Sequence, residues 1–148
     1  MLYHEKQNYV NIFSSILITA VFALIVYNKQ MAGIIDLTGD YRLWGYLLLI
    51  FVGVSVVARI IIQIIFHIIN VIITREEDVP KKDERDRMIA LKATRNAYYS
   101  LSFVLLTMIV LLALGAPINA VFIAFIIGGL VTEIVENSSQ IYYYRRSS

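Results

Sequence analysis

The stretch REEDVPKKDERDRMIALKATR, residues 75–95, decides the fold, because it is a charged interruption in a chain that is otherwise mostly apolar. It holds 13 of the 24 charged residues among the 148 residues of the whole chain. Hydrophobic residues make up 59% of the sequence and charged residues only 16%, whereas soluble domains are about half apolar and about a quarter charged. The composition therefore predicts a membrane protein that crosses the bilayer several times, with residues 75–95 as its central connection.

Four apolar stretches, two before and two after this connection, are long enough or nearly long enough to cross a bilayer, which takes about 20 helical residues. They cover residues 9–27, 43–74, 96–114 and 117–137. Because lipid offers the backbone no hydrogen-bond partner, each stretch should form an α-helix. We expect an all-α fold in which residues 1–148 form a single transmembrane domain of four helices, arranged as two hairpins. A cleaved signal peptide is the alternative for the first stretch, although no Ala-x-Ala cleavage site follows Tyr27.

The distribution of Lys and Arg predicts the orientation, because connections rich in these residues stay in the cytoplasm. The N-terminal tail, residues 75–95 and the C-terminal tail share one side and together hold ten Lys and Arg residues. The opposite side has only Lys29 and Arg42. We therefore expect a protein of the cytoplasmic membrane with both termini in the cytoplasm. Aromatic rings favour the membrane interface, so Trp44 should lie at the outer one.

The central connection also predicts where the third helix starts. Asp78 or Asp83 can cap a helix, because an aspartate side chain accepts hydrogen bonds from free first-turn amides. Neither Pro nor Gly interrupts residues 81–114, so we expect one helix that starts in the cytoplasm and continues as the third span. One stripe of that helix would carry Arg85, Ile89, Lys92, Asn96 and Tyr99.

Polar side chains inside two of the spans form a second pattern. Arg59 lies near the middle of the second span, where a charge costs at least about 2.5–3.5 kcal/mol and normally faces a partner or a water-filled cavity. Glu133 lies at a matching depth in the fourth span, which runs in the same direction. Helical spacing places further polar residues on the same two faces, namely Gln63 and His67 in the second span and Glu136, Asn137 and Gln140 in the fourth. We expect the two helices to pack along this polar seam, anchored by an Arg59–Glu133 ion pair.

The seam has two interpretations. It is either structural glue between helices, or a path for protons or ions in a small transporter or channel subunit. Four short helices leave little room for a private pore, so transport would need a homodimer.

Several kinds of chemistry have no support in the sequence. No cysteine is present, which excludes disulfides, Cys-ligated metals and a cysteine nucleophile. The only histidines are His4 and His67, and we expect no metal site and no cofactor. No catalytic motif or phosphate-binding loop stands out, so we expect no enzyme activity. The net charge of +2 is too small to indicate direct binding of nucleic acid.

Residues 83–98, DERDRMIALKATRNAY, resemble the pattern Asp-Glu-Arg-Asp-x-x-Ile-x-x-Lys-Ala-x-Arg-x-x-Tyr of a family of uncharacterised prokaryotic four-helix membrane proteins, a domain of unknown function. The closing residues 140–146, QIYYYRR, are similar to the end of that family. Genes of this kind often lie beside a small helix-turn-helix regulator. The resemblance implies a prokaryotic membrane protein that binds and antagonises such a regulator.

The candidate surface for a soluble partner is this motif, with an exposed Ile89 flanked by charges. Its residues are Asp83, Glu84, Arg85, Asp86, Arg87, Ile89, Lys92 and Arg95. The simpler alternative is that these charges solvate a helix end and set the topology. The function predicted from the sequence is a membrane regulatory or interaction protein. A small transporter or channel subunit and a purely structural subunit are the alternatives.

Overall fold

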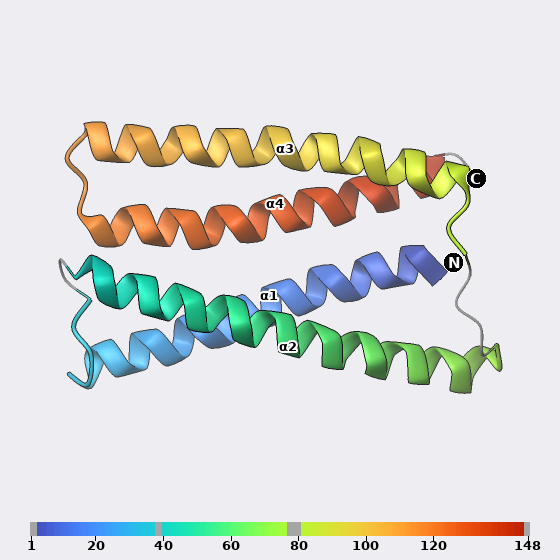
Figure 1. Cartoon of the computed structure of the whole chain (residues 1–148), viewed down its shortest axis with the longest axis horizontal. Coiled ribbons are helices and arrows are strands. Elements are labelled where there is room, and N and C mark those ends of the chain that lie inside the picture. The colour runs from blue at the N-terminus through green and yellow to red at the C-terminus, as the bar shows by residue number, and fades with distance from the viewer. Residues whose placement is uncertain (1–2, 38–39, 77–80, 147–148) are drawn as a thin grey trace.

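The computed structural model describes residues 3–37, 40–76 and 81–146. In this part of the chain all regular structure is helical, and four long helices are present (Figure 1). They are α1 (Tyr3–Met31), α2 (Tyr41–Thr74), α3 (Glu84–Ala113) and α4 (Ile118–Arg146). Each is long and apolar enough to cross a membrane, so the prediction of an all-α chain with four such helices is confirmed. Each helix is also longer than the apolar stretch that predicted it.

The start of α3 follows from two aspartates. Asp83 caps the helix through a capping box, in which its side chain accepts from the Asp86 amide while the Asp86 side chain accepts from the Asp83 amide. Asp83 is therefore the cap in use, whereas the other candidate, Asp78, lies outside the described residues. A single helix runs from the charged residues into the apolar ones, as predicted, although it begins at Glu84.

The start of α1, the end of α2, the start of α3 and the end of α4 lie together at one end of the molecule, which we name the terminal end (Figure 1). The α1–α2 and α3–α4 connections lie at the opposite end, the turn end. α3 and α4 lie side by side along most of their length, and α4 also packs against α1. α1 crosses α2 obliquely (Figure 1), and toward the terminal end α2 still contacts α1 through Gln63, which bonds to Gln7, and through Phe66, whose ring lies 5.3 Å from that of Tyr3.

Small residues let α3 and α4 approach each other closely, as is typical of helices packed in membranes. Ala93 and Ala97 of α3 are buried. Gly128 of α4 lies against Val104, and a Cβ atom added at Gly128 would overlap the Val104 side chain. A Cβ atom at the neighbouring Gly129 would meet no atom within 4 Å. Gly128 therefore sets how closely the two helices pack.

The packing of α2 differs from the prediction. We expected α2 and α4 to pack directly along the polar seam, but the closely packed pairs in the described chain are α3–α4, α1–α4 and α1–α2. Ser14 and Ser15 of α1 are small and buried, which lets α1 rather than α2 lie against α4. α2 reaches α4 through long side chains such as Arg59, which bonds to Glu133.

Trp44 is one of those long side chains, at the turn end. Its Nε1 donates a 2.8 Å hydrogen bond to Asn119 Oδ1 at the start of α4. Its ring stacks on Phe122, with the ring centroids 5.3 Å apart. Trp44 is only 4% exposed, so it joins two helices inside the protein instead of presenting its ring to the surroundings.

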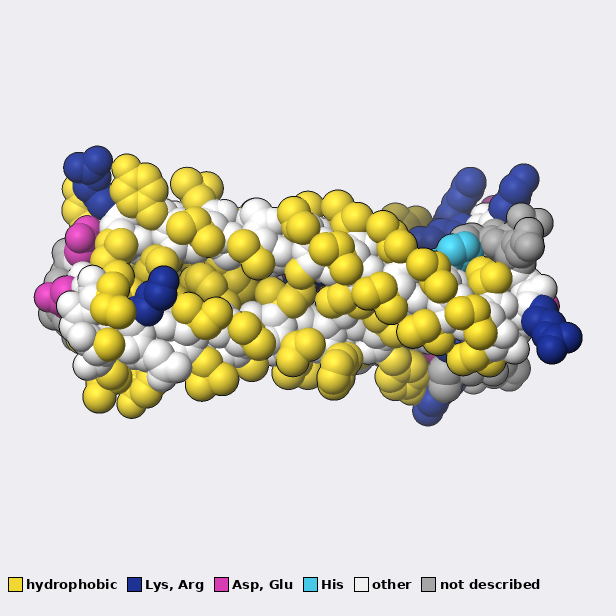
Figure 2. Space-filling view, turned by 90° about the horizontal axis from the view of Figure 1, so that it is seen from below, with side chains coloured by type: hydrophobic (Ala, Val, Ile, Leu, Met, Phe, Trp, Pro, Cys, Tyr) yellow, Lys and Arg dark blue, Asp and Glu magenta, His cyan; other side chains and the backbone are white. Residues whose placement is uncertain are grey.

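Hydrophobic side chains cover the middle of the molecule, and Lys and Arg side chains gather toward its ends (Figure 2). Such a surface suits contact with lipid, because exposed apolar area is favourable there and unfavourable in water. Together with the four apolar helices of the described chain, it indicates a multi-pass membrane protein.

Candidate functional site

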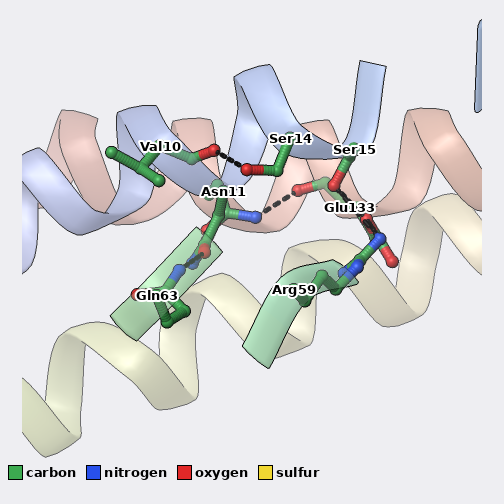
Figure 3. A network of polar contacts seen from close by, with 8 residues as sticks. Val10, Asn11, Ser14, Ser15, Arg59, Gln63 and Glu133 are labelled. Carbon is green, nitrogen blue, oxygen red and sulfur yellow. Dashed lines mark hydrogen bonds and ion pairs between the residues drawn. The ribbon is translucent and has the colours of Figure 1, made fainter. Parts of the chain in front are cut away.

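An ion pair lies about midway along α2 and α4, where side chains of three helices meet (Figure 3). Arg59 Nη2 of α2 donates a 2.6 Å hydrogen bond to Glu133 Oε2 of α4. The same nitrogen lies 3.3 Å from Ser15 Oγ of α1, and the Ser15 hydroxyl donates to Glu133 Oε2. The ion pair predicted from matching depths is therefore present. Ser15, which is 1% exposed, is a third member that the depth comparison did not include.

A ladder of amides continues from this ion pair toward the terminal end. Gln63 Nε2 of α2 donates a 2.6 Å hydrogen bond to Asn11 Oδ1 of α1, and Asn11 Nδ2 donates a 3.2 Å bond to Asn137 Oδ1 of α4 (Figure 3). Gln7 Nε2 adds a 3.0 Å bond to Gln63 Oε1. The seam residues Gln63 and Asn137 are thus joined through α1 and not directly to each other.

We did not predict that α1 takes part in the seam, because the depth comparison covered only the second and fourth spans. A signal was nevertheless present, since Gln7, Asn11 and Ser15 are spaced four apart and so share one helical face. In an otherwise apolar helix, such a stripe indicates a buried polar contact.

The other seam residues lie apart from this ladder. The Glu136 and Gln140 side chains line a cavity but form no hydrogen bond with another described residue. His67 lies farther along α2, and its Nδ1 is buried without a partner in the described ranges. The predicted seam therefore divides into a bonded part near Arg59, a part formed by Glu136 and Gln140 that faces open space, and His67, which lies apart from both.

That space is a polar cavity of about 330 Å³ between α1, α2 and α4, closed on one side by the first turns of α3. It extends from Arg59 and Glu133 toward Lys82 and Tyr144 at the terminal end. On the other side of the ion pair lies a mostly apolar cavity of about 290 Å³, also lined by Arg59 and Glu133 and reaching Phe51. The ion pair thus separates a polar compartment from an apolar one.

At the terminal end, α3 and α4 are joined by hydrogen bonds that we name the clamp. Tyr144 Oη of α4 donates a 2.7 Å bond to Asp86 Oδ1, and Arg85 Nη2 donates a 3.2 Å bond to the Tyr144 carbonyl oxygen. Farther along, Asn96 Nδ2 donates to Ser139 Oγ at 3.1 Å. These bonds join the charged start of α3 to the end of α4.

The clamp shifts the pKa values of two groups outside the predicted spans. Burial alone would raise the pKa of Asp86, but the hydrogen bonds from Tyr144 and from the Asp83 amide outweigh it and hold the pKa below the ordinary value. Burial raises the pKa of Tyr144, and its bond to the Asp86 carboxylate raises it further. At neutral pH the pair is therefore a phenol donating to a carboxylate.

A second contact joins the two ends of the chain. Arg145 Nε of α4 lies 2.9 Å from Glu5 Oε1 of α1, and Arg145 Nη2 donates a 2.6 Å bond to Tyr9 Oη. The hydrogen bond to Glu5 raises the pKa of Arg145. Sequence reasoning missed this pair, because nothing in a single sequence places an N-terminal tail against a C-terminal one.

The candidate partner surface is only partly available to a partner. Ile89, expected to be exposed, is 5% exposed and faces α4 together with the buried Ala93. Arg85 and Lys92 lie over the rings of Tyr144 and Tyr143, with the cations 5.8 and 5.5 Å from the ring centroids. Asp83 and Asp86 are used by the cap and the clamp. The predicted stripe of α3 from Arg85 to Asn96 is therefore the side that packs on α4, which corrects the prediction of an exposed Ile89.

The opposite side of α3 remains exposed. It carries three charged residues of the predicted surface and two apolar residues that were not in it. They are Glu84, Arg87, Met88, Leu91 and Arg95, and we name them the docking face. Met88 is 51% exposed and Leu91 is 65% exposed.

A scan of protein-family models, a search of curated proteins and a search of solved structures each found no match to the chain. The resemblance of residues 83–98 to a family pattern therefore stays a prediction. Over the described ranges, no group of three or more His, Asp or Glu side chains is placed to hold a metal ion.

Proposed function

We propose that the chain lies in a prokaryotic cytoplasmic membrane as two helical hairpins, α1–α2 and α3–α4, with the terminal end in the cytoplasm. The ten Lys and Arg residues of the tails and the central connection support this orientation, since only Lys29 and Arg42 flank the spans on the other side. α3 has 30 residues, about ten more than the bilayer core requires. Its first turns, including the docking face, would then project into the cytoplasm.

The function that we infer is regulatory: the docking face binds a small soluble protein at the membrane surface. The observation that carries this inference is the exposure of Met88 and Leu91 on the charged, projecting part of α3. Apolar area left in water costs about 25 cal/mol per Å², and a partner would cover it.

The clamp supports this function, because it holds the docking face in place before a partner arrives. A face already ordered loses less conformational entropy on binding than a free helix end. Tyr144, Asp86 and Arg85 provide that order.

The charges of the docking face define the partner. Arg87 and Arg95 flank the apolar pair, so the partner should carry an apolar groove bordered by acidic side chains. A small helix-turn-helix regulator is the partner that we propose, held at the membrane and so kept from its DNA site.

Site-specific photo-crosslinking tests this function. A photoreactive residue at position 91 should capture one defined soluble protein in cells, and the same residue at position 31, exposed at the turn end, should not. With that protein purified, Leu91→Glu should weaken binding to the chain in nanodiscs by at least about tenfold. The matched control Met31→Glu should leave binding unchanged. Equal capture at both positions, or full binding by Leu91→Glu, would remove the docking face from consideration.

A second candidate function is transport of protons or ions by a dimer of this chain. It is favoured by the position of the Arg59–Glu133 pair between the polar and the apolar cavities. Ion flux into proteoliposomes should then depend on Glu133, and Glu133→Gln should change it. Flux no greater than that of empty liposomes would exclude this candidate.

A further inference from the structure

The polar cavity gathers most of the buried polar atoms that the fold leaves without partners. Among the described residues, six buried side-chain nitrogen or oxygen atoms have no hydrogen-bond partner. Four of them belong to residues that line this cavity: His4 Nδ1, His4 Nε2, Asn8 Nδ2 and Arg59 Nε. We name these four the orphan atoms. Each buried polar atom without a partner costs about 1–3 kcal/mol, so their gathering in one cavity points to a polar molecule that binds there.

Two of the orphan atoms can only donate hydrogen bonds. Asn8 is 4% exposed and lines the cavity, and its amide nitrogen is a donor without acceptor capacity. Arg59 Nε is likewise a donor only, and Glu133 is already bonded to a different nitrogen of the same guanidinium, Nη2. Both donors lack a hydrogen-bond acceptor. A carboxylate group accepts hydrogen bonds more strongly than a neutral oxygen does.

The same cavity contains a carboxylate that needs the opposite kind of partner. Glu133 is paired with Arg59, and Asp86 accepts the hydrogen bond of Tyr144. Glu136 lines the cavity one helical turn from Glu133 and has no hydrogen bond or ion pair to any described residue. Lys82 also lines this cavity but forms no ion pair with Glu136, so the Glu136 carboxylate remains available to a cationic group of a ligand.

We propose that this cavity binds a small zwitterion of the α-amino-acid type, with its carboxylate on Arg59 and its ammonium group on Glu136. An anion alone would satisfy the donors but would be repelled by Glu136, whereas a cation alone would leave the donors unpaired. A zwitterion satisfies both. The volume of about 330 Å³ is at the small end of the range for ligand pockets, about 300–1,000 Å³, and suits a ligand of that size.

Ligand binding at this site goes beyond partner docking and does not require transport. Asp86 and Tyr144 line the same cavity and also form the clamp between α3 and α4. A ligand in the cavity would therefore contact the structure that holds the docking face, and it should stabilise the terminal end.

The first test measures thermal unfolding of the purified full chain in lipid nanodiscs. An equimolar mixture of the common L-amino acids is the probe, and sodium acetate and ethylammonium chloride at the same total concentration represent the anion alone and the cation alone. The mixture should raise Tm by about 3 °C or more, and the two salts should not. No shift with the mixture, or an equal shift with either salt, would overturn the proposal.

The second test uses variants of matched shape. Glu136→Gln keeps the side-chain volume and should weaken binding of the mixture by about tenfold, as expected for the loss of one charge-assisted hydrogen bond. Glu76→Gln makes the same change at an exposed position outside the cavity and should bind normally. Equal binding by both variants would contradict the proposal. Leu91→Glu should also bind normally, so failure of the docking face and failure of the cavity can be distinguished.

Discussion

α3 and α2 are attached to the rest of the molecule in different ways. α3 packs closely on α4 through small residues such as Gly128 and Ala93, whereas α2 reaches its neighbours through Arg59, Gln63 and Trp44. α2 is nevertheless the more apolar helix. Apolar surface by itself joins helices weakly in lipid, because lipid tails cover it equally well. α2 is held by these polar side chains together with the ring contacts Phe22–Phe51 and Tyr3–Phe66.

The largest effect should come from removing the polar attachment of α2. Glu133→Leu leaves Arg59 without its partner in the membrane interior, and we expect a loss of about 2.5–3.5 kcal/mol in unfolding free energy. Unfolding in mixed detergent micelles measures it. Glu136→Leu, which removes an unpaired carboxylate one turn away, should cost much less.

The double variant Arg59→Leu, Glu133→Leu sharpens the same prediction. It leaves no uncompensated charge, so it should be more stable than Glu133→Leu alone. A double variant no more stable than the single one would show that the pair is not what attaches α2.

A smaller effect should follow from disturbing the close packing of α3 on α4. Gly128→Val places methyl groups where the Val104 side chain lies, and such overpacking costs about 1–3 kcal/mol. Disulfide formation between single cysteines introduced into α3 and α4 measures the helix separation in this cysteine-free chain, and it should slow. Gly129→Val, with open space at its Cβ, should leave the rate unchanged. Equal rates in both variants would contradict close packing at Gly128.

The smallest effect should come from the clamp. Tyr144→Phe removes the hydrogen bond to Asp86 and should cost about 1 kcal/mol. Because the pKa of Asp86 is lowered in the folded protein, this contribution is present above the ordinary Asp range and is lost as pH falls through the lowered pKa. Unfolding measured from pH 7 to pH 2 should therefore show the difference between the variant and the parent shrinking below the ordinary Asp range. A constant difference over that range would exclude Asp86 as the acceptor.

Much of the fold follows from the sequence, since length and apolar character predict four helices and a capping aspartate, Asp78 or Asp83, predicts where α3 starts. The Arg59–Glu133 pair also follows, because helical rise fixes how deep each residue lies along a span. The sequence does not predict which helices pack against each other. Whether Ile89 faces α4 or water, and whether α1 or α2 lies against α4, depends on how closely small residues such as Ser15 let two backbones approach. Spacing along one helix carries no information about that distance.

The contacts between α1 and α4 fix the register of these two antiparallel helices. Ser15 bonds to Glu133 and Asn11 bonds to Asn137, and each step is one helical turn on both sides. Sliding α1 by one turn would bring Asn11 opposite Glu133 and Ser15 opposite Gly129, which has no side chain to bond. The two helices therefore resist piston-like movement relative to each other.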